Sequence, residues 1–205
     1  MAGRALVMGK FWTVLTFFTL LAMVGLIQGR SMLTLISLMY IGALFFRIPD
    51  TWQEVVTIEF VGTAGMLLAI ISGPLIAMFY VFTAQWITRF VSPFGSLEDY
   101  NDTFIESSSY AATILLSPIL ITISENVLLS FMLHFMIVKF IITQFLNFFI
   151  YRTALITEFF YDLVSLPFEI FQSQLLLSLF GLSILSSFGV DGWTLGSLDI
   201  ISKVI

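Results

Sequence analysis

Apolar runs of membrane-spanning length recur along this chain, and they limit its fold more than any other feature. We interpret the following runs as helices: residues 11–28, 31–46, 52–72, 126–151 and 165–188. A transmembrane helix needs about 20 predominantly apolar residues, and these runs are too continuously apolar for the alternating strands of a membrane barrel. The sequence therefore predicts an all-α integral membrane protein of about five transmembrane helices, with residues 1–205 forming one polytopic domain.

Composition supports the membrane class and excludes several functions. Charged residues make up 10% of the chain and hydrophobic residues 59%, whereas a soluble domain carries about 25% charged residues. The eight basic residues are scattered and the formal net charge is −5, so no basic patch for nucleic acid is expected. Without cysteine the chain has no disulfide or iron–sulfur chemistry. A single histidine, His134, cannot build a metal site alone, so we expect no metal and no cofactor in this chain.

Some segments outside these runs are harder to interpret. The first apolar run begins near Phe11 and has no small-residue cleavage site, so we read it as a span and not as a removable signal. Apolar sequence also continues over residues 74–90, beyond a Gly-Pro break. The sequence leaves open whether residues 107–123 cross the membrane. Residues 92–109 predict a polar loop that faces solvent or a partner, and they carry four acids: Glu98, Asp99, Asp102 and Glu106.

The third run, which ends in "EFVGTAGMLLAIISG" at residues 59–73, combines an acid with small residues. Gly65, Ala69 and Gly73 are four residues apart, so they share one helix face and predict close packing against another helix. Glycine also makes a local irregularity such as a π-bulge easier to accommodate.

Charged side chains at membrane depth cost about 2.5–3.5 kcal/mol on insertion scales, so each needs a reason. Glu59 lies roughly 10 Å into the third run at about 1.5 Å per residue. It is either a proton-path carboxylate or a carboxylate in a water-filled crevice or paired with another subunit. Lys139, near the middle of its run, is either a proton-relay lysine or a snorkelling or ion-paired structural lysine.

Polar residues of the run 126–151 show a helical pattern. At about 100° per residue, Asn126, His134, Gln144 and Asn147 form one polar stripe, and Lys139 points to the opposite side. Such a stripe argues for a neighbouring helix or an internal water path. We interpret His134 as a member of this stripe and not as a metal ligand.

Two motifs, in this order, resemble those of a known family. The stretch "FVGTAG" begins at Phe60, ten residues after Asp50, and "LPFE" at residues 166–169 is followed by Ser173 and a leucine run. With these motifs the chain resembles subunit 6 of the proton-pumping NADH–ubiquinone oxidoreductase, respiratory complex I. Phe60 replaces the tyrosine of the family's Tyr-Val-Gly core. Residues 74–152 match poorly, so no residue is carried over from them.

The resemblance implies a membrane-arm subunit without a cofactor of its own. FMN, iron–sulfur clusters and ubiquinone would belong to other subunits, where NADH oxidation and quinone reduction occur, and this chain would couple them to proton translocation. The third helix would carry a π-bulge whose rewinding gates a water wire, at Phe60, Val61 and Gly62, with Met66 one turn on. Over the whole chain the candidate proton-path residues are Glu59, Asp50, Glu169, Lys139 and His134, of which Lys139 and His134 are selected as polar residues at membrane depth and not by the resemblance.

The same resemblance implies partners and a location. The partners would be other membrane-arm subunits and lipids in a hetero-oligomer, within the mitochondrial inner membrane or, alternatively, a bacterial plasma membrane. A second hypothesis is a non-enzymatic Yip-like scaffold of membrane trafficking, because "FGSLEDYNDTFIESSSYAA" resembles that family's glycine-plus-tyrosine segment. That hypothesis leaves the "LPFE" motif unexplained. A small carrier is disfavoured because the chain shows no internal repeat.

Overall fold

A computed structural model describes residues 2–50, 60–91, 97–151 and 155–196, and within these ranges the chain is helical and contains no strand. The predicted all-α class is therefore confirmed. The elements in chain order are α1 (Ala2–Ile27), α2 (Ser31–Asp50), α3 (Phe60–Ser72), α4 (Pro74–Val91), α5 (Leu97–Leu115), α6 (Ser117–Ile123), α7 (Leu128–Tyr151), α8 (Leu155–Leu176), the π-helix η1 (Leu177–Gly181) and α9 (Leu182–Ser187).

Several of these helices are long and apolar enough to cross a membrane. Within the described residues the candidate spans are Gly9–Ile27, Pro74–Val91, Leu128–Ile150 and Asp162–Ser187. A fifth would be the pair Tyr100–Leu115 and Ser117–Ile123, which bends by 56° as in a broken span or a re-entrant loop. The number of candidate spans therefore agrees with the expected number of about five. The helices that form these spans are not all the ones expected.

Two of the runs that were expected to span form shorter helices in the described residues, and one helix that can span was not expected to do so. Within the residues whose side chains are described, Ser31–Phe46 and Phe60–Ser72 are shorter apolar helices; α2 itself continues to Asp50, and residues 52–59 of the third run lie outside the described residues. Pro74–Val91 forms a separate helix, because Gly73 turns the chain with a positive φ of 86° and Pro74 begins α4. Proline suits the first helical position because its missing N–H would have no partner there.

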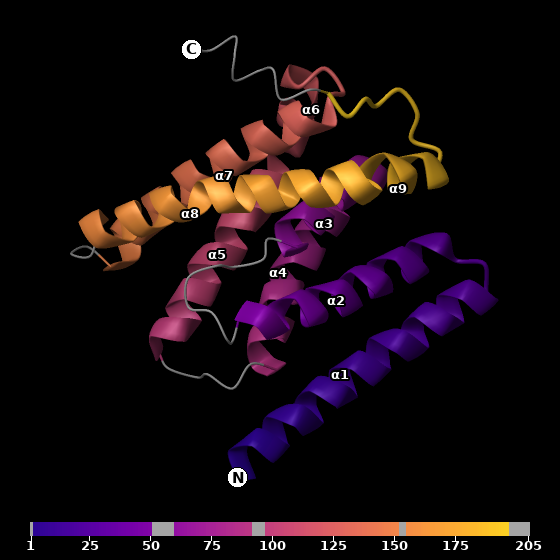
Figure 1. The fold of residues 1–205 in the computed structure, drawn as a ribbon, viewed down its shortest axis with the longest axis horizontal. Coiled ribbons are helices and arrows are strands. Elements are labelled where there is room, and N and C mark those ends of the chain that lie inside the picture. The colour runs from indigo at the N-terminus through magenta and orange to yellow at the C-terminus, as the bar shows by residue number, and fades with distance from the viewer. Residues whose placement is uncertain (1, 51–59, 92–96, 152–154, 197–205) are drawn as a thin grey trace.

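Helix α3 lies at the centre of the fold. It packs against α2, α4, α5, α6, α7, α8 and α9, and its residues from Val61 to Ala69 are all buried. Figure 1 shows α1 and α2 side by side at one edge, with the continuous helix of α8, η1 and α9 lying across the opposite part of the fold beside α7. Small side chains let neighbouring helices approach α3 closely. A Cβ on Gly65 would overlap Val81 of α4 and Ile114 of α5.

The π-bulge expected between Glu59 and Met66 is a wrong prediction for the described part of that segment. Phe60–Ser72 is regular α-helix, and Glu59 lies outside the described residues. The glycine at position 65 makes room for α4 and α5, so it does not mark irregular winding. The π-helix instead occupies Leu177–Gly181 in the last span, where a Cβ on Gly181 would meet Leu128 at 2.7 Å.

The loop expected over residues 92–109 is also wrong, because α5 begins at Leu97. Its serine and threonine side chains face the protein interior, and their hydroxyls bond within the helix. Ser109 donates to the carbonyl of Ile105 at 2.7 Å, and Thr113 donates to the carbonyl of Ser109 at 2.7 Å. A hydroxyl that bonds to the preceding turn can be buried in a helix, so polar composition here does not indicate a loop.

The segment after α9 folds back onto the start of α7. The amide of Leu128 donates to the carbonyl of Thr194 at 2.8 Å, and the amide of Leu129 donates to the carbonyl of Leu195 at 3.1 Å. The first amides of a helix have no partner within the helix. The C-terminal segment therefore caps α7.

Candidate functional site

A buried ion pair joins α7 and α8 in the apolar part of the protein. Lys139 Nζ donates to Glu169 Oε2 at 2.8 Å, and the two side chains are 10% and 11% exposed. Lys139 lies near the middle of the candidate span Leu128–Ile150. Charged side chains within a membrane are rare and usually pair with one another or line a water-filled cavity. The pair therefore explains how a lysine is accommodated at this depth.

Further contacts hold the two charged groups in place. Ser165 Oγ donates to Glu169 Oε1 at 3.4 Å, from one helical turn earlier on α8. Lys139 Nζ also lies 4.9 Å from the ring centroid of Tyr110, a fully buried residue of α5. An ammonium near an aromatic face is stabilised by the ring quadrupole. Three helices thus contribute to the position of the ammonium.

A second carboxylate, Asp162, lies on the same face of α8 two turns before Glu169. Gln144 Nε2 donates to Asp162 Oδ2 at 2.6 Å, and Asn147 Nδ2 lies 3.5 Å from the same oxygen. The sequence interpretation did not select Asp162. The seven-residue spacing of Asp162 and Glu169 was the available signal, since residues seven apart share a helix face.

A small cavity lies between the two carboxylates. It measures about 30 Å³ and is lined by Lys139, Phe140, Thr143, Asp162, Leu166 and Glu169. A cavity above about 10–15 Å³ can hold a water molecule when two to four polar partners surround it. The two carboxylates, the ammonium and the Thr143 hydroxyl meet that requirement.

The polar face of α8 continues beyond the ion pair. We call Asp162, Ser165, Glu169 and Ser173 the α8 polar column, because their spacings of three and four residues place them on one face. Ser173 is fully buried and accepts a hydrogen bond from Thr63 of α3 at 2.9 Å. Through its contacts with Lys139 and Thr63, the α8 polar column therefore connects α7 with the central helix α3.

The stripe expected on α7 divides differently in the structure. Gln144, Asn147 and Lys139 all contact α8, although Lys139 was expected on the side of the helix opposite the stripe. His134 lies elsewhere, with its Nδ1 3.0 Å from Ser124 Oγ. Asn126 precedes α7 and has a positive φ of 59°. Lys139 and Gln144 lie about 140° apart on the helix, yet their long side chains both reach α8.

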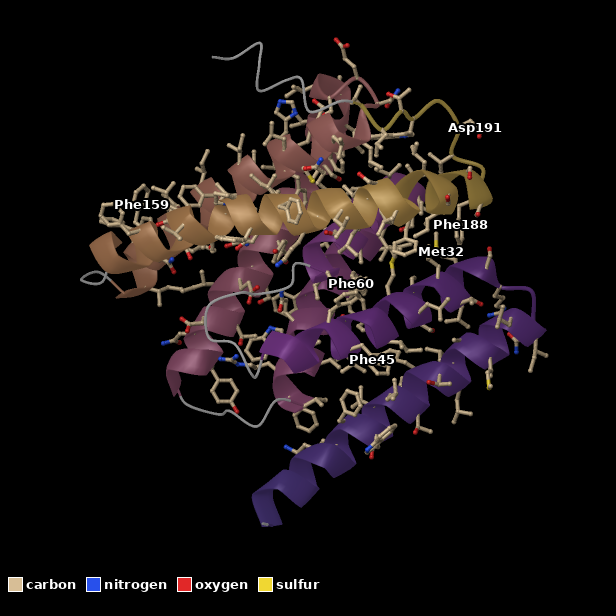
Figure 2. All side chains as sticks on the ribbon, viewed as in Figure 1. Met32, Phe45, Phe60, Phe159, Phe188 and Asp191 are labelled. Atoms are coloured by element: carbon tan, nitrogen blue, oxygen red, sulfur yellow. The ribbon has the colours of Figure 1, made fainter. Side chains whose placement is uncertain are left out.

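The other residues predicted for the site lie apart from the ion pair. Phe60 stacks on Phe46 of α2, with ring centroids 4.8 Å apart, and Figure 2 shows it beside α2. Asp50 is the last residue of α2; its side chain, like all of Glu59, lies outside the described part of the structure. Of the remaining predicted residues, Gly73 forms the turn to α4. The others are all buried in α3: Val61, Gly62, Gly65, Met66 and Ala69.

Comparison with known protein families, characterised proteins and solved structures finds no match to this chain. Among the described residues no group of three or more His, Cys, Asp or Glu could hold a metal ion. The chemistry that the site offers is therefore that of its charged and hydrogen-bonding side chains: an ammonium, two carboxylates, hydroxyls and room for water.

Proposed function

We propose that this chain is a membrane-arm subunit, of the subunit 6 type, of a proton-pumping NADH:ubiquinone oxidoreductase. One observation carries the proposal. Glu169, the acid of the "LPFE" motif on which the resemblance depends, forms the buried ion pair with Lys139. A motif residue engaged in a charge pair at membrane depth has a physical role in a protein that moves protons.

The proposal assigns this chain a coupling role in the mitochondrial inner membrane, with a bacterial plasma membrane as the alternative. NADH oxidation and quinone reduction, together with FMN, the iron–sulfur clusters and ubiquinone, belong to other subunits, and the partners are membrane-arm subunits and lipids. Charges interact strongly in a medium of low dielectric constant. A protonation change in a neighbouring subunit would therefore change the electrostatic energy of the Lys139–Glu169 pair.

The involvement of α3 in coupling depends on its position and not on irregular winding. The hydrogen bond from Thr63 to Ser173 joins α3 to the α8 polar column. A displacement of α3 would therefore act on the helix that carries Glu169. Packed interiors transmit such displacements because they have little free volume.

Native gel electrophoresis tests the proposal. An affinity-tagged copy of the chain should co-migrate with the band that oxidises NADH in the gel. Consistent absence from that band would overturn the proposal and favour the Yip-like scaffold. A matched pair of variants adds a functional readout: Glu169→Gln should reduce proton pumping per NADH oxidised, whereas Asp191→Asn, outside the candidate spans, should leave it unchanged.

A further inference from the structure

The contacts between α7 and α8 place two carboxylates at one small polar cavity. Asp162 and Glu169 both line it, and seven residues of helix separate them by roughly 10 Å along the axis of α8 at about 1.5 Å per residue. This rise separates the two backbone positions, whereas both side chains line the same cavity. A water molecule between the two carboxylates would shorten each step of a proton transfer.

The side chains around the cavity suit a bound water molecule. Lys139 offers ammonium N–H donors, and both carboxylates offer acceptor oxygens. Thr143 lines the cavity and donates its hydroxyl proton to the carbonyl of Lys139 at 2.9 Å, so its oxygen can still accept a hydrogen bond. Phe140 and Leu166 form the apolar remainder of the wall. The cavity therefore has the size and the hydrogen-bonding groups that a bound water molecule needs.

An independent observation also indicates water near Asp162. The Oε1 atom of Gln144 is buried and has no hydrogen-bond donor among the described residues, while its Nε2 binds Asp162. A buried acceptor without a donor is destabilising by about 1–3 kcal/mol, and ordered water commonly satisfies such groups. Water is therefore expected at Gln144, the hydrogen-bond partner of Asp162, as well as in the cavity.

We propose that Asp162 and Glu169 form a proton-transfer site, in which a water molecule in the cavity carries a proton from one carboxylate to the other. Protonated Asp162 gives its proton to the water, and the water gives one of its own to ionised Glu169. The products are ionised Asp162, neutral water and protonated Glu169. Lys139 stays protonated throughout and holds the Glu169 carboxylate in place.

The contacts at the two ends of the site define a path along α8. Asp162 and Glu169 both lie within this helix, which begins at Leu155, and Glu169 lies two turns after Asp162. The described titratable groups that face the site are these two carboxylates, Lys139 from α7 and, against Lys139, Tyr110 from α5. The path therefore runs from the contact of Asp162 with Gln144 to the Lys139–Glu169 ion pair. This inference deepens the proposed function, since protons are what that function moves, but membership of complex I is not needed for its test.

Infrared difference spectroscopy of the full chain in lipid nanodiscs tests the site directly. Spectra taken between acidic and neutral pH should show C=O bands of protonated Asp162 and Glu169, assigned with ¹³C-carboxyl aspartate or glutamate. Asp162→Asn should shift the titration midpoint of the Glu169 band by about one pH unit or more, as coupled groups do. Glu169→Gln should shift the Asp162 band by a similar amount. Independent titration of the two bands, or absence of any titrating band from them, would overturn the proposal.

A second pair of variants protects the test against misfolding. Thr143→Leu fills the cavity while keeping both carboxylates, and it should abolish the coupling between the two bands. Thr143→Ser keeps the hydroxyl and should preserve it. Coupling that survives Thr143→Leu would overturn the role of the cavity water. These readouts are independent of the native gel, so a chain outside complex I could still show the coupled bands, and a chain inside it could lack them.

Discussion

Thr63 of α3 donates a hydrogen bond to Ser173 of α8, with 2.9 Å between the two hydroxyl oxygens. The residues are 110 positions apart in the chain, and both are buried. Hydrogen bonds between the helices of membrane proteins contribute about 0.6 kcal/mol on average and up to about 1.7 kcal/mol. This bond joins the central helix to the polar column that contains Glu169.

Replacing one partner of this bond should destabilise the protein measurably. Thr63→Val keeps the shape of the side chain but leaves the Ser173 hydroxyl without its donor, at a cost of about 1–3 kcal/mol. Unfolding in mixed detergent micelles measures the change. Thr13→Val is the matched control, because the Thr13 hydroxyl is exposed and bonds to the carbonyl of Gly9 in its own helix. Equal stability of the two variants would contradict a structural role for the interhelical bond.

The double variant Thr63→Val/Ser173→Ala sharpens this test. Removing both hydroxyls leaves no unpaired group at the contact, so the double variant should be more stable than Thr63→Val alone. Strictly additive losses would instead show that the two hydroxyls act independently.

Breaking the buried ion pair should have a larger effect. Lys139→Met leaves the Glu169 carboxylate without its ammonium, and such changes destabilise proteins by about 3–5 kcal/mol. Adding Glu169→Gln should restore part of the loss, because no uncompensated charge then remains. The control is Lys10→Met. Lys10 lies near the start of α1, and its ammonium lies 4.3 Å from the ring centroid of Phe90. A loss at Lys139 no greater than at Lys10 would count against a buried pair.

A methyl group at Gly65 should disturb the centre of the fold. In Gly65→Ala the new Cβ meets Val81 and Ile114, so α4 and α5 must move, and overpacking of this kind costs about 1–3 kcal/mol. Gly9→Ala places the same group where nothing lies within 4 Å. That control should be neutral or stabilising by up to about 1 kcal/mol, since alanine favours helices. Similar thermal stability of the two variants would argue against close packing at Gly65.

The cap on α7 should depend on Gly196. Gly196 and Gly192 both have positive φ angles, of 79° and 85°, but only a Cβ on Gly196 would overlap Val127. Alanine strains the backbone at either position. Only Gly196→Ala should also displace the C-terminal segment and speed hydrogen exchange of the Leu128 and Leu129 amides. Exchange rates equally changed in Gly192→Ala would show that backbone strain alone loosens the cap.

Errors at α3 and α5 share one physical cause. The small residues of α3 were read as a sign both of close packing and of irregular winding, and the serines of α5 as a sign of a loop. In the structure Gly65 makes room for Val81 of α4 and Ile114 of α5, within a regular helix. Ser109 donates its hydroxyl proton to a carbonyl one turn earlier in its own helix. Residue type indicated that each position is unusual, but it did not decide between these explanations.

The candidate site shows the same limit. Lys139 was selected from the sequence as a charge at membrane depth and Glu169 through the "LPFE" motif, but their pairing was not predicted. Asp162 was not selected, because the last apolar run was taken to begin at residue 165. Its seven-residue spacing from Glu169 places both on one helix face, but its partner Gln144 of α7 follows only from the packing of α7 against α8.

Run length and apolar composition were sufficient to predict an all-α membrane protein of about five spans, because a helix must satisfy its own backbone across the whole hydrocarbon layer. That requirement is local, so it can be read from consecutive residues. The pairing of Lys139 with Glu169, and of Thr63 with Ser173, depends on which helix faces share a boundary. Many helix arrangements bury the same apolar residues equally well, so these contacts emerge only from the packed fold.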